Sequence, residues 1–101
     1  MTDNRRSATR HDCSLACSLE IDGKTVETEM GNLSLGGAYI ALGYRAPMGT
    51  QVRLRFRIPT HEEAITVGGH VRWATESGIG VQFDGLRARE VWSLNKYFEK
   101  L

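Results

Sequence analysis

The segment Gln51-Val-Arg-Leu-Arg-Phe-Arg-Ile58 decides the fold, because its side chains alternate strictly between apolar and basic. Successive side chains of a β-strand point to opposite faces of a sheet, so a period of two predicts a strand with one buried and one solvated face. The expected inward residues are Val52, Leu54, Phe56 and Ile58, and the expected outward residues are Arg53, Arg55 and Arg57.

Shorter stretches with the same period lie on both sides of this segment. Residues 14–30 predict a hairpin that turns at Asp22-Gly23, and further strands are expected over 38–42, 65–73 and 79–83. Glycine and proline mark the joints between them. Six short strands suggest a mainly β fold, a closed or nearly closed antiparallel barrel, because closure removes exposed sheet edges.

The period changes after Gly85, where apolar residues follow helical spacing. We expect a C-terminal helix at about residues 86–101 that packs on the barrel. Its predicted inner stripe is Val91, Leu94, Phe98 and Leu101, and its predicted outer face carries Glu90, Lys96, Glu99 and Lys100.

The length of 101 residues suits one domain with one core. Residues 1–12 have almost no apolar side chains, so a flexible arm is expected there, followed by the barrel and helix over 13–101. No apolar run is long enough to span a membrane, and the arginine-rich start lacks the apolar segment of a secretory signal. We therefore expect a cytoplasmic location without membrane insertion.

Charge is distributed unevenly along the chain. The 13 basic and 12 acidic residues leave a formal net charge of +1, which argues against a protein that coats DNA. Arg5, Arg6 and Arg10 nevertheless lie close together, with only Asp3 to offset them. The arm is therefore positive and the predicted barrel faintly acidic.

The sequence contains no pattern typical of an enzyme or a metal site. His11, His61 and His70 are scattered, and no serine or cysteine lies in a nucleophile motif. Cys13 and Cys17 are too far apart along an extended strand to form a disulfide, so reduced thiols are expected. We predict no catalytic residue, no metal and no cofactor.

Arg6 and Arg10 form the first constellation that suggests binding. Their spacing of four residues places both guanidiniums on the same side, whether the arm is extended or makes a helical turn. Arginine binds phosphate oxygens and also the O6 and N7 acceptors of guanine. A solvated basic tail is the alternative interpretation.

The second constellation is Gly31-Asn32-Leu33-Ser34-Leu35-Gly36-Gly37. In an extended backbone, Asn32 and Ser34 point outward while the two leucines point into the core. The short polar side chains offer hydrogen bonds, and Gly36 and Gly37 let a base or phosphate approach the backbone. The alternative is a strand that ends in a tight bend, with glycines at positive φ.

In combination, these features resemble the PilZ domain family. That family carries an RxxxR motif, which Arg6 and Arg10 match, ahead of a [D/N]xSxxG motif, which Asn32, Ser34 and Gly37 match. The resemblance covers nearly the whole chain from about Arg5, and includes the segments Val71-Arg-Trp73 and Gly78-Ile-Gly-Val-Gln-Phe83.

The resemblance implies a bacterial receptor for cyclic di-GMP, a ring of two guanosines joined by two phosphodiesters. It implies that Arg6 and Arg10 bind phosphates and guanine edges, and that Asn32, Ser34 and Gly37 contact a guanine. Asn32 stands where the family often has Asp, and its neutral amide is the weaker acceptor for guanine N–H groups. The family binds either one ligand or an intercalated pair.

Further ligand contacts implied by the resemblance are less specific. Arg5 either adds a guanine contact or remains a surface arginine, and Gly36 adds backbone access. Trp73 either stacks on a guanine or packs in the core. It shares the parity of Val67 and Val71, which favours packing.

The expected mechanism is a switch in which cyclic di-GMP orders the arm over the barrel and changes contact with an unidentified downstream protein. Motility, exopolysaccharide production and virulence are the family's outputs. An alternative is a PilZ-like interaction module that does not bind the nucleotide. A third class is a barrel that binds single-stranded nucleic acid through Arg53, Arg55 and Arg57. The alternative interpretations of these three arginines are a solvated strand face and a patch that binds an acidic partner.

Overall fold

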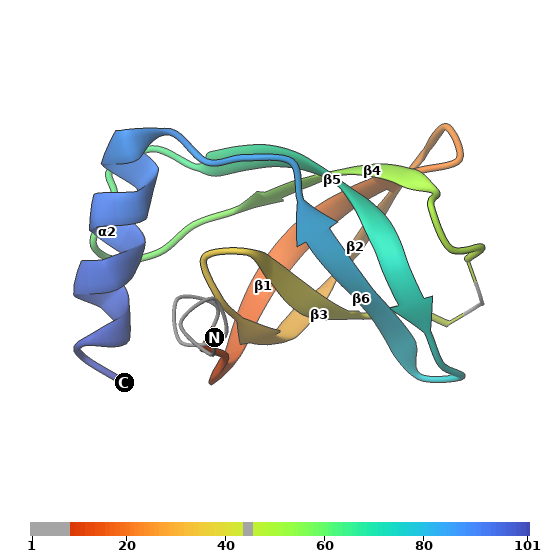
Figure 1. Cartoon of the computed structure of the whole chain (residues 1–101), viewed down its shortest axis with the longest axis horizontal. Coiled ribbons are helices and arrows are strands. Elements are labelled where there is room, and N and C mark those ends of the chain that lie inside the picture. Colours follow the sequence, from red (N-terminus) through yellow and green to blue (C-terminus); the bar gives the residue numbers. More distant parts are fainter. Residues whose placement is uncertain (1–8, 44–45) are drawn as a thin grey trace, which may run out of the picture.

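The computed structural model describes residues 9–43 and 46–101 and shows a closed antiparallel barrel followed by a helix (Figure 1). Around the barrel the strands run in the order β1-β2-β3-β6-β5-β4. The predicted mainly β architecture is confirmed. The elements are β1 His11–Ile21, β2 Lys24–Leu33, β3 Gly37–Ala41, β4 Gln51–Phe56, β5 Ile65–Ala74, β6 Gly78–Phe83 and α2 Ala88–Phe98.

Strand β4 has the alternation that its sequence predicts. Val52, Leu54 and Phe56 are buried, and the arginines between them are exposed. Pairing with β1 on one side and β5 on the other places these apolar residues inside the barrel. Burial of each such side chain stabilises the fold by roughly 1.5–3 kcal/mol.

The hairpin of β1 and β2 turns where the sequence predicts. Asp22 and Gly23 both have positive φ, 54° and 76°, as a tight two-residue hairpin turn requires. Strand β1 begins at His11, earlier than the expected start near Ser14, and its register with β2 shifts between Asp12 and Leu15.

Both cysteines of β1 are free thiols, as predicted. Cys17 lies in the core, and burial is the main cause that raises its pKa to about 11, with smaller contributions from neighbouring Glu27, Cys13 and Glu29. Cys13 is half-buried and its Sγ lies 3.7 Å from the Met30 carbonyl oxygen. Burial raises the pKa of Cys13 as well, so both thiols are protonated at neutral pH.

The predicted face of the helix is confirmed in part: Leu94 is buried and Phe98 packs on the core, while Lys96, Glu99 and Lys100 are exposed. Glu90, expected outside, is buried because its Oε1 accepts the Arg87 backbone N–H at 2.9 Å and caps the first turn. Leu101, expected inside, is exposed beyond the last helical residue. The buried residues of α2 are Glu90, Ser93, Leu94 and Tyr97.

Two polar contacts and one ring contact hold α2 in place beside the β4–β5 connection (Figure 1). The Thr60 hydroxyl donates to the Ser93 carbonyl at 2.7 Å, and His61 Nδ1 lies 2.7 Å from the Ser93 hydroxyl. The His11 ring stacks on Phe98, with centroids 4.0 Å apart. The start of β1 therefore contacts the end of the helix.

No helix within the described ranges has the length and apolar content needed to cross a membrane.

Candidate ligand-binding site

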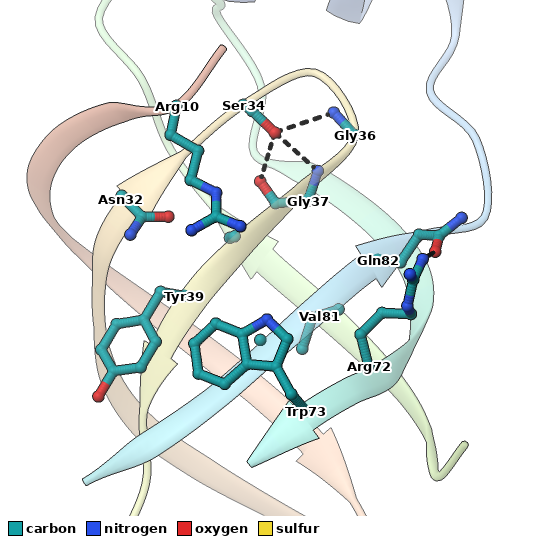
Figure 2. A pocket seen from close by; sticks show the side chains of 12 residues that line it. Arg10, Asn32, Ser34, Gly36, Gly37, Tyr39, Arg72, Trp73, Val81 and Gln82 are labelled. Carbon is teal, nitrogen blue, oxygen red and sulfur yellow. Dashed lines mark hydrogen bonds between the residues drawn. The ribbon is translucent and has the colours of Figure 1, made fainter. Parts of the chain in front are cut away.

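A pocket of about 430 Å³ lies on the outer face of β2, β3, β5 and β6 (Figure 2). Of the residues predicted to bind ligand, Arg5 and Arg6 lie outside the described residues. All the others line this pocket: Arg10, Asn32, Ser34, Gly36, Gly37 and Trp73. Residues far apart in the sequence are thus brought together as the motif predicts.

Ser34 builds the turn that leads from β2 into β3. Its hydroxyl oxygen accepts the backbone N–H groups of Gly36 and Gly37 at 3.2 and 3.1 Å, and it lies 3.2 Å from the Gly37 carbonyl oxygen, to which it can donate. The side chain was expected to point outward, but it is only 5% exposed, because these turn contacts draw it inward. Ser34 therefore fixes the backbone that forms one wall of the pocket.

Gly37 is required by the close approach of two strands. A Cβ at this position would lie 2.1 Å from the Val81 carbonyl oxygen of β6. The interpretation of Gly36 and Gly37 as positive-φ residues is wrong, because the described glycines with positive φ are Gly23 and Gly49. At Gly36 a Cβ would meet open space, so its absence leaves the pocket rim uncovered.

Arg10 and Asn32 form the polar side of the pocket. Arg10 immediately precedes β1 and is exposed, and Figure 2 shows its guanidinium extending over the pocket near Asn32. Asn32 is half-buried on β2, opposite Asp12 of β1 and Tyr39 of β3. Within the described part of the chain, no hydrogen bond or ion pair engages the Arg10 guanidinium. Its donors are available to a ligand.

Trp73 lies on the outer surface, so the predicted packing in the core is wrong. The register of β5 with β6 shifts at this point: Val71 pairs with Val81, and Trp73 pairs with Gly80. Two residues of β5 thus span one step of β6, which is a bulge, and the bulge reverses the parity on which the prediction relied. Trp73 is 37% exposed.

The indole of Trp73 forms a flat aromatic floor with Tyr39 (Figure 2). The two ring centroids are 5.6 Å apart and the planes are inclined by 19°. A Cβ on Gly80 would lie 2.2 Å from the indole, so the glycine lets Trp73 lie directly on β6. The Tyr39 hydroxyl lies 2.8 Å from that of Ser77.

Among the lining residues that were not predicted from the sequence, three have polar or aromatic side chains: Tyr39, Arg72 and Gln82. Arg72 Nη1 donates a hydrogen bond to Gln82 Oε1 (Figure 2). The segment Val71-Arg-Trp73 contained a signal for Arg72, but only the bulge shows that Arg72 and Trp73 share one face. The charged residues that line the pocket are Arg10 and Arg72, so it combines positive charge with an aromatic surface. Such a surface suits a flat base attached to phosphate.

Comparison with known proteins shows the family and the fold. The sequence model of the PilZ domain matches residues 4–100. No curated protein sequence matches the chain. Among solved structures, the inhibitor of motility MotI/DgrA from Bacillus subtilis is similar, with a TM-score of 0.82 and 24% identity over 95% of this chain and 50% of that protein. The chain therefore spans about half the length of this first relative.

Two further structures have the same fold. One is the PilZ domain of CeSA from a cellulose-synthesizing bacterium, with a TM-score of 0.71, 14% identity, and coverage of 92% of this chain and 97% of that one. The other is PlzA from Borreliella burgdorferi, solved in complex with c-di-GMP, with a TM-score of 0.62, 16% identity, and coverage of 97% and 37%.

Proposed function

Because this chain belongs to the PilZ domain family, we propose that it is a receptor for cyclic di-GMP and that the pocket at Arg10, Asn32 and Trp73 is the binding site. The observation that carries the proposal is the placement of the Arg10 guanidinium, which no other described residue engages, beside the Tyr39–Trp73 floor. Cyclic di-GMP supplies the matching groups, which are anionic phosphates and flat guanines. The solved complex of PlzA with this ligand supports the choice.

Each motif residue has a proposed role. Arg10, and Arg6 through the same motif, bind phosphate oxygens and guanine edges. The Asn32 carboxamide hydrogen-bonds a guanine. Ser34 acts mainly through the turn that it holds, which presents the Gly36 and Gly37 backbone to the ligand. Trp73 supplies a stacking surface, and Arg5 adds a further guanine contact.

The proposal includes a switch without catalysis. Ligand bound between Arg10 and the barrel orders the N-terminal arm over the outer face of β2 and β3 and changes the surface offered to a downstream protein. The cytoplasmic location expected from the sequence belongs to this proposal, as do outputs in motility, exopolysaccharide production or virulence. MotI/DgrA is itself described as an inhibitor of motility.

Isothermal titration of the full chain with cyclic di-GMP tests the proposal. We expect saturable binding by the unaltered protein and its loss in Arg6→Ala and in Arg10→Ala, because each change removes charge-assisted hydrogen bonds to the ligand. Arg53→Ala is the matched control, since it removes an exposed arginine from β4, away from the pocket. Unchanged affinity in both motif variants would contradict the proposed site.

The interaction module that does not bind the nucleotide gives the opposite result. It predicts no heat when cyclic di-GMP is added to the folded, unaltered chain, together with a purified partner that binds in its absence.

A further inference from the structure

A bulge in β5 brings two neighbouring side chains to the same face of the barrel. Along a regular strand, Arg72 and Trp73 would point to opposite faces. The register shift between Val71 and Trp73 leaves both exposed, and Figure 2 shows them side by side at the edge of the pocket. Arg72 and Trp73 therefore lie on the same face of the sheet, with the Arg72 guanidinium directed toward Gln82.

The orientation of Arg72 is set by β6. Its Nη1 donates to Gln82 Oε1, and Gln82 is half-buried on the adjacent strand. Asp84, which directly follows β6, has its Oδ1 3.5 Å from His70 Nδ1. Among the described residues no carboxylate pairs with Arg72, so its positive charge and its remaining N–H donors are available to the pocket.

The open face of the Trp73 ring decides what those donors can reach. One side of the indole lies against Gly80, so a base stacks on the other side, which faces the pocket. A base that stacks there and extends toward Gln82 would place one edge at the Arg72 guanidinium. Guanine presents O6 and N7 there as a pair of acceptors, whereas adenine presents N7 with an amino donor in place of O6.

We propose that Arg72, positioned by Gln82, reads the edge of the base that stacks on Trp73 and gives the site its preference for guanine over adenine. This inference rests on the proposed cyclic di-GMP function and assigns a specificity-determining residue outside both sequence motifs. Arg10 and Arg72 lie on different sides of the aromatic floor, so the contact proposed for Arg72 is separate from the contacts proposed for Arg10 (Figure 2).

The test compares cyclic di-GMP with cyclic di-AMP, which has the same phosphodiester ring. Affinity for cyclic di-GMP is measured by titration and for cyclic di-AMP by competition, in the unaltered chain and in Arg72→Met. Methionine keeps an unbranched side chain but removes the charge and the donors. We expect the affinity for cyclic di-GMP to fall roughly tenfold or more, with a much smaller change for cyclic di-AMP.

Two further variants sharpen the result. Gln82→Met keeps the Arg72 charge but removes the oxygen that accepts its hydrogen bond. It should lower the ratio of the affinity for cyclic di-GMP to the affinity for cyclic di-AMP, by a smaller factor than Arg72→Met does. Arg53→Met removes an equally exposed strand arginine outside the pocket and should leave both affinities unchanged. Circular dichroism confirms that each variant is folded.

Three outcomes would overturn the inference. Equal losses for both ligands in Arg72→Met would assign Arg72 to a phosphate, and no loss for either would remove it from the site. Both leave the proposed function intact. If the unaltered, folded chain does not bind cyclic di-GMP, the proposed function fails and this inference fails with it.

Discussion

Trp73 shows how much one side chain contributes to the candidate site. Its indole covers Gly80, lies beside the Tyr39 ring and presents its other face to the pocket. The sequence contains one other tryptophan, Trp92, which is 61% exposed on α2. The two residues share one chemistry and differ in position, so they form a matched pair for experiment.

Trp73→Ala should weaken cyclic di-GMP binding by roughly 1–3 kcal/mol, because base stacking on an aromatic side chain contributes about that much. Titration calorimetry measures the loss. Trp92→Ala, the control, should leave the affinity unchanged, since this residue does not line the pocket. Equal effects of the two substitutions would show that Trp73 does not contact the base.

Motif spacing was enough to predict which of several distant residues line the pocket. The motif spacing predicts that Arg10, Asn32, Ser34 and Gly37 lie together, and all four line one pocket. The inward turn of the Ser34 hydroxyl could not be predicted, because it depends on where the Gly36 and Gly37 N–H groups point after the chain has turned. Gly37 likewise serves a contact with β6 that is distant in sequence.

The strands show which structural information a pattern carries. Strict alternation over residues 51–58 predicts β4 and its buried face, because parity survives wherever pairing is regular. The same reasoning failed in β5, since one extra residue at the bulge inverted the parity of Trp73. The position of a bulge depends on the pairing with the neighbouring strand, so the sequence of β5 alone does not predict it.

Helix α2 shows a second limit of periodicity. Apolar spacing located the helix but placed Glu90 outside, although this carboxylate is 8% exposed and accepts the Arg87 N–H. A capping residue is chosen for its hydrogen bond to the backbone, so its burial does not follow hydropathy.

Glu90→Ala should lower the free energy of unfolding by about 0.5–2 kcal/mol, because the first turn of α2 loses its cap. Urea denaturation followed by circular dichroism measures the change. The control is Glu99→Ala, which removes an exposed carboxylate 4.0 Å from Lys96 and should cost less, since exposed ion pairs contribute little. A larger loss in Glu99→Ala would contradict the capping role.

At the scale of the molecule, the arginines of β4 and those of the pocket differ in their neighbours. On β4, Arg53 lies opposite Glu20 of β1, and Arg55 lies opposite Ser18, whose hydroxyl donates to Glu27 at 2.9 Å. Acidic neighbours thus offset the β4 arginines, which is unfavourable for a nucleic-acid surface and consistent with a solvated face. None of the described residues that line the pocket at Arg10 and Arg72 is acidic.

The stability of the whole barrel should fall in alkaline solution because of Cys17. Burial raises the pKa of its thiol from 9.0 to about 11, so the folded state keeps a proton that the unfolded state releases. The stabilisation that the protonated Cys17 thiol gives the folded state is fully present below pH 9 and is lost as the pH rises to about 11.

Urea unfolding at several pH values measures the effect. Cys17→Ala removes the thiol and should show a shallower decline of the unfolding free energy over the same interval, even if the variant is less stable throughout. Parallel declines in the two proteins would rule out Cys17 as the cause.

The positions of the two tryptophans also make them intrinsic fluorescence probes of two different parts of the molecule. Trp73 lies in the pocket beside Tyr39, and Trp92 lies on α2 with Lys96 Nζ 5.5 Å from its ring centre. In Trp92→Phe, the remaining tryptophan fluorescence comes from Trp73 and reports occupancy of the pocket. In Trp73→Phe, it comes from Trp92 and reports the surroundings of the helix. Stopped-flow traces of the two proteins, recorded with the same ligand, would show whether the helix responds together with the pocket or after it.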